Sequence, residues 1–200
     1  MFIQVITGTV ADALGLQRLV ERWHEELRPG ATGHLGTTAG VTDDGRFVVL
    51  ARFESEEAAR RNSGRIEQGN WWAETEKCLE GVTFLDSAAV DTLLGGGKDN
   101  AGFVQVMRGR VTDPEKLAAL GPRKGEIEAA LRRARPDVIG DVMVVTADGA
   151  YIEAVYFASE AEARRAEAAG LSDDMAALME EFMAAVAIDE FFDLKGPWLH

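Results

Sequence analysis

The stretch RFESEEAARR, residues 52–61, has a second copy in the chain, YFASEAEARR, at residues 156–165. Each copy has an aromatic strand end, a serine, an acidic first helical turn and a pair of arginines. A repeat of this kind decides the architecture, because each copy corresponds to one structural unit. The doubling therefore predicts a chain built from two similar units.

The correspondence extends over both halves of the chain. FIQVITGTV begins at Phe2 and FVQVMRGRV begins at Phe103, and Phe53 corresponds in the same way to Phe157. The spacing between the copies grows along the chain, as expected when lengths change inside a helix or a loop. We expect two repeats, at residues 1–94 and 102–194. A flexible glycine-rich linker at residues 95–101 joins them, and a short C-terminal tail follows at residues 195–200.

Each repeat shows the element order β-α-β-β-α-β. In the first repeat we expect a strand at residues 2–10, a helix at 12–28, a hairpin at 33–53, a broken helix at 55–79 and a last strand at 81–87. A unit of this order is ferredoxin-like, with helices on one face of its sheet. Residues on both faces of the first strand are apolar, so a second sheet should cover the free face. The expected class is therefore α+β.

Composition excludes several classes of function. The net charge of the 200 residues is −13 and the sequence pI is about 4.7, whereas nucleic-acid binders and proteins of anionic membranes need basic faces. Cys78 is the only cysteine, and the three histidines are dispersed, so neither a disulfide framework nor a metal site is expected. No apolar run approaches the roughly 20 residues of a membrane helix. The N-terminal residues alternate like a strand and lack a signal peptide's basic start, so we expect a cytoplasmic protein.

With two such repeats, the chain resembles the dimeric α/β barrel superfamily, in its antibiotic-biosynthesis-monooxygenase-like branch. That branch usually builds its barrel from two identical chains, and this chain resembles a fused version, with both repeats packed sheet to sheet as an intramolecular barrel. It also resembles a group of uncharacterised two-repeat actinobacterial proteins with RFESEEAARR, QGNWW and FVQVM-type segments. The resemblance implies a monomer that completes its own barrel, or a homodimer of such monomers.

The resemblance implies a cofactor-free monooxygenase- or isomerase-like enzyme that acts on a small apolar molecule. The alternative is a non-catalytic module that binds a small molecule or another protein. Haem-degrading relatives carry an asparagine on the first strand, where this chain has Gln4, and a histidine where it has Gly81 or Val82. No glycine-rich nucleotide motif is present either, so no cofactor is expected.

Candidate ligand-binding residues of the first repeat are His24, His34, Asn70 and Trp72. A histidine can act as a general base near neutral pH, and His34 is therefore also a catalytic candidate. The alternative for both histidines is an ordinary surface or hydrogen-bonded role. Asn70 is expected to cap a helical segment. Trp72 and its neighbour either stack on a ligand or pack in the core, as their counterparts in the apolar stripe of the last helix suggest.

The second repeat carries charges where the first does not: Arg108, Asp141 and Glu153 replace threonines and a valine. The first and third strands of this fold are neighbours, so an Arg108–Glu153 ion pair could hold an anionic ligand or orient a proton transfer. The alternative is a structural pair. We therefore expect unequal halves, and we place the pocket in the first, where residues 63–64 and 68–69 should interrupt the helix and leave room beside the sheet.

Overall fold

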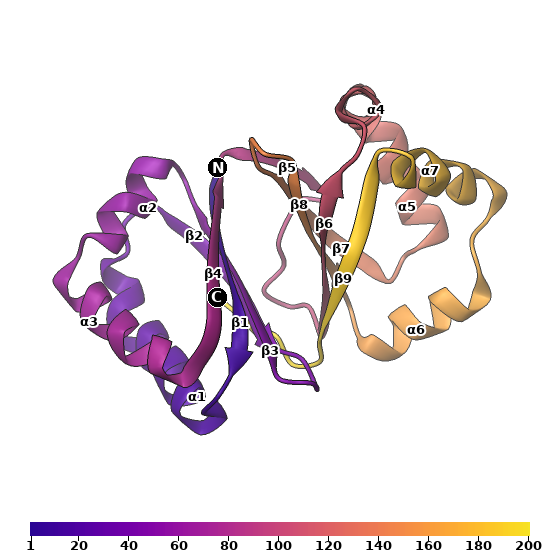
Figure 1. Cartoon of the computed structure of the whole chain (residues 1–200). Helices are drawn as coiled ribbons and strands as arrows, with labels where there is room; N and C mark the ends of the chain where they lie inside the picture. The colour runs from indigo at the N-terminus through magenta and orange to yellow at the C-terminus, as the bar shows by residue number, and fades with distance from the viewer. The chain divides into compact units, whose positions relative to one another are not determined.

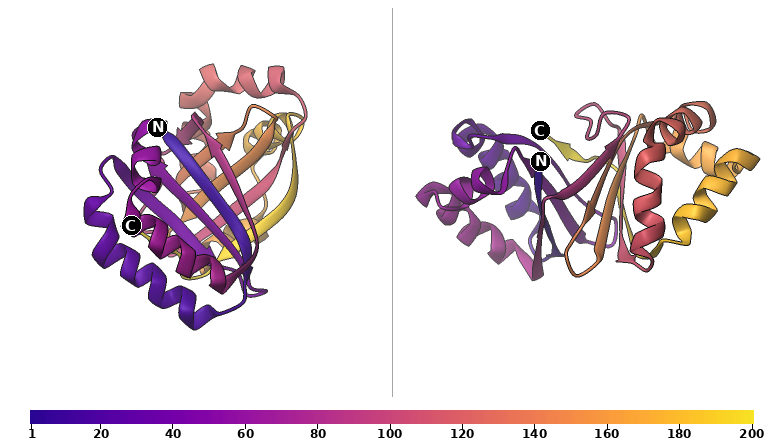
Figure 2. Two further views of the ribbon diagram at one scale, coloured as in Figure 1. Left: turned by 60° about the vertical axis from the view of Figure 1, so that its left-hand side comes forward. Right: turned by 90° about the horizontal axis from the view of Figure 1, so that it is seen from above.

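The computed structural model describes all 200 residues and divides the chain into two compact units. The first unit comprises Met1–Ala88 with Trp198–His200, and the second comprises Ala89–Pro197. Each unit contains one five-stranded antiparallel sheet. The helices of each unit lie along one face of its own sheet, as the views in Figures 1 and 2 show.

The sheet of the first unit has the strand order β10-β2-β3-β1-β4. Its strands are β1 (Phe2–Val10), β2 (His34–Val41), β3 (Arg46–Phe53), β4 (Leu79–Ser87) and β10 (Trp198–Leu199). Its helices are α1 (Ala13–Arg22), α2 (Glu56–Ser63) and α3 (Ile66–Thr75), with short turns η1 (Trp23–Leu27), η2 (Arg28–Gly30) and η3 (Glu76–Cys78).

The sheet of the second unit has the matching order β5-β7-β8-β6-β9. Its strands are β5 (Ala89–Leu93), β6 (Phe103–Val111), β7 (Val138–Val145), β8 (Ala150–Phe157) and β9 (Val186–Leu194). Its helices are α4 (Pro114–Leu120), α5 (Lys124–Ala134), α6 (Glu160–Ala169) and α7 (Asp173–Met183), with the turn η4 (Gly121–Arg123) between α4 and α5.

Strand register shows that the two units are structural copies. His34 of β2 pairs with Phe53, and Val138 of β7 pairs with Phe157; an irregularity follows at the same place in both pairs. The expected α+β fold of two tandem ferredoxin-like repeats is therefore confirmed, and with it the residue correspondence between the repeats. The packing of the repeats into one barrel stays a prediction.

Local sequence signals explain where the helices begin. Asp12 accepts a hydrogen bond from the Gly15 amide at 2.9 Å, and Ser55 accepts one from Ala58 at 3.2 Å. These side chains satisfy amides that have no partner inside the helix. The expected cap at Asn70 is wrong: α3 begins at Ile66 and runs on through Asn70, so the glycine at 69 does not interrupt it.

Two short edge strands shift the boundaries that the sequence suggested. Residues 89–93, placed in the first repeat, form β5 and pair with β7, whereas residues 198–199, placed in the tail, form β10 and pair with β2. The Thr37 amide donates to the His200 carbonyl oxygen at 2.6 Å, so the C-terminal residue is held in the first sheet. Each added strand satisfies backbone groups that an open sheet edge would leave unpaired.

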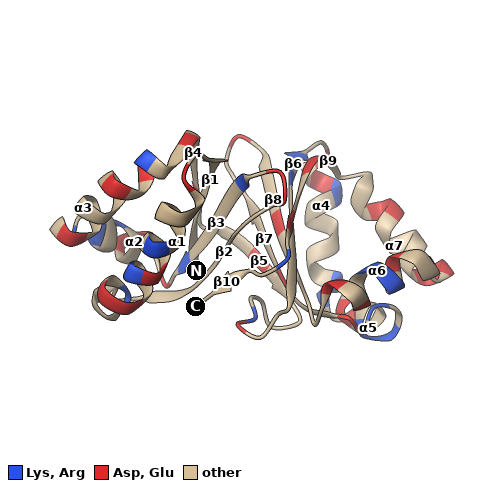
Figure 3. Ribbon diagram, turned by 90° about the horizontal axis from the view of Figure 1, so that it is seen from below, with Lys and Arg blue, Asp and Glu red and all other residues tan.

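Charged residues lie mainly on the helices, and the sheets are largely uncharged (Figure 3). No helix is both long and apolar enough to cross a membrane. The face of each sheet that its helices cover is therefore the place where an enclosed apolar space can form.

Candidate functional site

A cavity of about 790 Å³ lies in the second unit, between the sheet and its helices. Helices α4, α5 and α7 contribute one wall and strands β5 to β9 contribute the other. Most of the lining is apolar, with residues such as Met107, Leu117, Met143, Met175, Phe182 and Ile188. A space of this volume and character is typical of small-molecule sites.

The floor of the cavity is formed by rows of residues that face the helices across paired strands. One row crosses the whole sheet from edge to edge and consists of Asp91, Met143, Glu153, Met107 and Phe191. Because paired residues share a face of the sheet, the carboxyl of Glu153 enters the cavity between two methionine side chains.

A second row on the same face carries the second carboxyl. Asp141 of β7 pairs with Val155, which pairs in turn with Gln105. Asp141 and Glu153 are therefore diagonal neighbours on adjacent strands, a separation that side chains can bridge. Both line the cavity.

The two carboxyls share a hydrogen bond and have raised pKa values. Burial is the main cause for both residues: Asp141 is only 4% exposed, and Glu153 is half-buried against the cavity. The charges of Glu153 and Asp91 raise the pKa of Asp141 further, and Lys124 opposes them. The pair therefore keeps one proton at pH values where an exposed carboxyl has lost its own, because two like charges this close cannot both form readily.

The Tyr151 hydroxyl completes the polar group. Tyr151 is fully buried on β8, and its hydroxyl has no hydrogen-bond partner of normal geometry. It lies close enough to Glu153 to lower the pKa of that carboxyl, while burial and then the Glu153 charge raise the pKa of Tyr151 itself. Its ring packs edge-on against Phe182 of α7, with centroids 5.9 Å apart.

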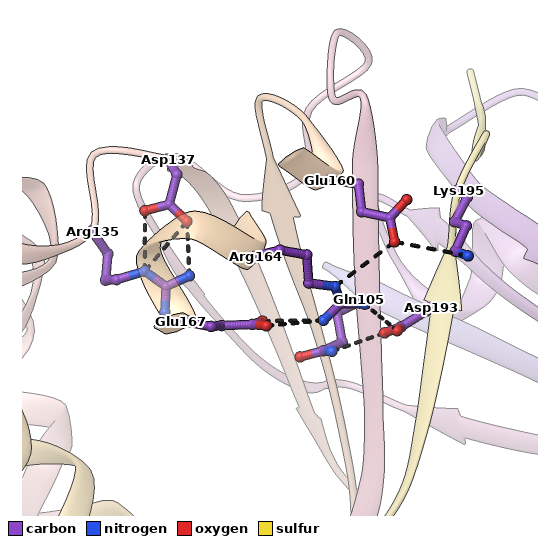
Figure 4. Close-up of polar contacts among 8 residues, drawn as sticks. All are labelled: Gln105, Arg135, Asp137, Glu160, Arg164, Glu167, Asp193 and Lys195. Carbon is purple, nitrogen blue, oxygen red and sulfur yellow. Dashed lines mark hydrogen bonds and ion pairs between the residues drawn. The ribbon is translucent and has the colours of Figure 1, made fainter. Parts of the chain in front are cut away.

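The cations that line the cavity are already paired. The Lys124 ammonium contacts Asp91 at 3.0 Å, and the Arg135 guanidinium contacts Asp137 at 2.7 Å. Figure 4 shows Arg135 beside a neighbouring group of polar residues, in which Gln105 donates to Asp193 at 2.8 Å. Neither cation is therefore committed to the Asp141–Glu153 pair.

The same group contains Arg164, which contacts three carboxylates, those of Glu160, Glu167 and Asp193 (Figure 4). The Arg164 guanidinium also lies over the ring of Phe103, 5.1 Å from its centroid. This network ties α6 to β6 and β9 at one end of the cavity, and it holds the Gln105 amide through Asp193.

Large apolar side chains surround the opening of the cavity. Leu171, Met179, Met183 and Phe191 line it and are nevertheless 42% to 49% exposed. Flexible methionines at an opening adapt to ligands of different shape.

Solved structures share this fold along the full chain. A candidate monooxygenase from Lactobacillus acidophilus NCFM matches with a TM-score of 0.74 and 13% identity, covering 100% of this chain and 98% of its own. A candidate monooxygenase from Fusobacterium nucleatum matches with a TM-score of 0.75 and 9% identity, covering 100% of this chain and 93% of its own. An anthrone oxidase-like protein matches with a TM-score of 0.65 and 13% identity, covering 100% of this chain and 92% of its own. No family model and no curated protein matches the sequence.

The chain has the fold of the antibiotic-biosynthesis-monooxygenase-like proteins. The resemblance expected from the sequence is confirmed at the level of the fold. At these identities the likeness carries the fold alone, and the chemistry of the site has to come from its own residues.

The corresponding space in the first unit of this monooxygenase-like fold contains aromatic side chains. Trp72 packs in a cluster with Leu16, Phe47 and Cys78, and its ring lies 5.2 Å from that of Phe84. The Trp71 indole donates to the Leu19 carbonyl oxygen at 2.7 Å. These tryptophans occupy volume that smaller residues leave empty in the second unit.

The first-repeat candidates lie on β2, η1 and α3 of the first unit, and none of them lines the cavity of the second unit. His34 contacts the Thr37 hydroxyl at 2.8 Å, and its ring lies edge-on to Phe53 at 5.4 Å. Its pKa is lowered to about 4, by burial first and then by nearby positive charges. His24 stacks on His200, 4.0 Å between centroids, and Asn70 is exposed on α3. Roles for these residues stay predictions.

Two expectations from the sequence need correction. The large cavity lies in the second unit rather than the first. The helix is interrupted at 63–64 as expected, but α3 continues through 68–69 and the tryptophans pack beside the sheet. The proposed Arg108–Glu153 pair is wrong: Arg108 sits opposite Ile152 and so points to the other face of the sheet, where it contacts Glu190 at 2.7 Å.

Sequence reasoning found Asp141 and Glu153 as charges inside strands but missed that they face each other. The available signal is the alternation of side chains along the strand. Glu153 lies on the same face of β8 as Tyr151 and Val155, the face that packs on apolar helices. A carboxyl at a core-facing strand position is rarely tolerated without a partner.

Proposed function

We propose that the chain is an enzyme that binds a small, largely apolar molecule in the second unit and transfers a proton to or from it through the Asp141–Glu153 pair. The reaction class is cofactor-free oxygenation or isomerisation. The observation that carries this proposal is a pair of neighbouring carboxyls on the floor of an apolar cavity, where burial raises their pKa values. Such groups are the usual candidates for acid–base catalysis.

The pair offers both halves of a proton transfer. One carboxylate oxygen can accept a proton while the protonated partner donates one, and raised pKa values bring both steps closer to neutral pH. Glu153 is the group better placed to meet a ligand, because it is only half-buried whereas Asp141 is almost fully buried. Asp141 then acts as the positioning partner that holds the Glu153 carboxyl and shares its proton.

Proton removal is the first step common to both reaction classes. Glu153 would remove a proton from a carbon conjugated with a carbonyl group, either directly or through an aromatic ring, leaving an enolate. Return of the proton at another carbon completes an isomerisation. In an oxygenation, molecular oxygen is the co-reactant: it accepts the electrons, one oxygen atom replaces both hydrogens of the CH₂ group as a carbonyl, and the other leaves as water.

Anthrone is a suitable first probe, since its CH₂ group is acidic and one protein of the same fold is described as anthrone oxidase-like. Oxygen uptake and anthraquinone formation measure turnover, and the shift in melting temperature measures binding. We expect Glu153→Gln to lower kcat at least about 100-fold while the melting shift persists. Glu115→Gln, an exposed residue of α4, is the matched control.

The outcome separates the enzyme from the binding module. Full turnover by Glu153→Gln would refute the assigned base. Apolar ligands that stabilise the wild-type chain without being converted, across anthrone and a panel of ketones with acidic CH groups, would favour the non-catalytic alternative.

A further inference from the structure

We propose that the second-unit cavity selects its ligand by charge: it binds apolar amines as ammonium ions against the Asp141–Glu153 pair and rejects carboxylates of the same shape. The inference shares the cavity of the proposed function but does not depend on turnover. It follows from which charges line the cavity and which of them already have partners.

The charged lining is predominantly acidic. Asp91, Asp141, Glu153 and Glu167 line the cavity against two cations, Lys124 and Arg135. Each cation already contacts a carboxylate, at 3.0 Å and 2.7 Å respectively. Glu167 is likewise held by Arg164 at 3.0 Å. The charge left without an opposite partner is therefore the one carried by the Asp141–Glu153 pair.

Burial makes that charge selective. In an apolar surrounding the interaction between two charges is much stronger than in water, because little solvent screens it. An ammonium group beside Glu153 would neutralise the pair, whereas a carboxylate ligand would bring a third negative charge into the same space. The buried Tyr151 hydroxyl, which has no partner of normal geometry, can rotate to donate fully to Glu153 when the proton of the pair leaves.

The apolar lining suits the rest of such a ligand. Met107 and Met143 flank Glu153 on the floor, and Phe182 and Phe191 line the wall and the opening. Aromatic faces attract cations, and thioethers pack well against rings. The floor crosses five strands, which corresponds to about 19 Å at the usual strand spacing. The cavity is therefore long enough for a ring system with an aminomethyl group.

The pH dependence follows from the groups around the pair. Those that face it are Asp91 of β5, Lys124 of α5 and Tyr151 of β8, and only Lys124 is cationic. Lowering the pH adds the second proton to the pair and removes the charge that holds the ammonium. Aliphatic amines stay protonated well above neutral pH, so amine affinity should fall on acidification while the affinity of a neutral ligand stays constant.

The test uses three probes of one shape on the full chain: 1-naphthylmethylamine, 1-naphthalenemethanol and 1-naphthoic acid. Calorimetric titration at about pH 8 should show the amine binding at least about 30-fold tighter than the alcohol, with the acid weakest. Glu153→Gln should bring the amine to the affinity of the alcohol and leave the alcohol unchanged. Glu115→Gln should preserve the preference.

Equal affinity for amine and alcohol would overturn the inference, as would a preference that survives Glu153→Gln. If that variant does not fold, titration of the wild-type chain from about pH 8 to about pH 5 decides, because an unchanged amine affinity contradicts the role of the pair. Amine selectivity without turnover of any probe would sustain this inference and defeat the proposed enzyme. Turnover of anthrone without amine selectivity would do the reverse.

Discussion

The two units share strand order, register and helix caps, yet the space between sheet and helices differs completely in content. In the first unit Trp71 and Trp72 pack there, and their counterparts in the second are Leu178 and Met179, which line a cavity. On the sheets, Val49 and Thr37 of the first unit correspond to Glu153 and Asp141 of the second. The first unit thus has large aromatic side chains where the second has a cavity, and it has uncharged residues where the second has two carboxyls.

This contrast teaches what fusion of two repeats permits. In a dimer of identical chains, symmetry gives both subunits the same residues at each position. Within one chain the copies can diverge, so one can supply stability while the other bears the cost of buried carboxyls. Each of the following substitutions either gives one unit the residue found at the corresponding position of the other unit, or removes a carboxyl group from the second unit.

The largest effect on stability is expected from Trp72→Met, which gives the first unit the residue that the second has at position 179. Loss of the indole leaves a void, and the free energy of unfolding should fall by about 2 to 3 kcal/mol in urea denaturation. The reciprocal change Met179→Trp is the control and should cost less than about 1 kcal/mol, because the cavity can accept the ring. Equal losses would show that the units are equally well packed.

A smaller effect of opposite sign is expected from Asp141→Asn. A carboxyl whose folded pKa is raised contributes stability below its unfolded pKa of about 3.9, and this contribution is lost as the pH rises through the folded pKa. Relative to the wild type, the variant should therefore gain stability with rising pH, reaching about 1 to 2 kcal/mol near neutrality.

Asp148→Asn provides a control of reversed sign. Hydrogen bonds from the Thr146 hydroxyl and nearby backbone amides lower the pKa of Asp148, so its ionised form stabilises the fold at neutral pH. This variant should lose stability relative to the wild type as the pH rises. The same direction in both variants would contradict the opposed pKa shifts.

At neutral pH the smallest effect is expected from His34→Val, which introduces the residue found at 138 in the second unit. A histidine whose folded pKa is lowered from 6.5 to about 4 contributes stability above 6.5, and this is lost as the pH falls towards 4. The wild type should lose stability across this window more steeply than His34→Val. Parallel pH profiles in thermal denaturation would show that His34 is not held neutral.

Local signals in the sequence predicted much of the fold. Ser55 and Ser159, the serines of the two repeat copies, cap their helices, and the glycine and proline at 121–122 separate α4 from α5. The short strands β5 and β10 were not predicted, because five and two residues at a sheet edge carry no periodic signal of their own.

The site was harder to predict for two physical reasons. The sheet face on which Arg108 lies depends on strand register, and a shift of one residue reverses it. The sequence alone therefore could not show that Arg108 and Glu153 lie on opposite faces of the sheet. The cavity is a small difference between the volume that the backbone encloses and the volume that side chains fill. Trp72 and Met179 reveal that difference only when both units are compared.

The central claim is that the space between sheet and helices is open in the second unit and filled in the first. Crystals of the chain under xenon pressure test it directly, because xenon enters apolar cavities without any knowledge of the natural ligand. The account predicts xenon between the second sheet and α7, beside Met107, Met143 and Phe182. Xenon bound only among Trp23, Trp71 and Trp72 of the first unit, or in neither unit, would contradict it.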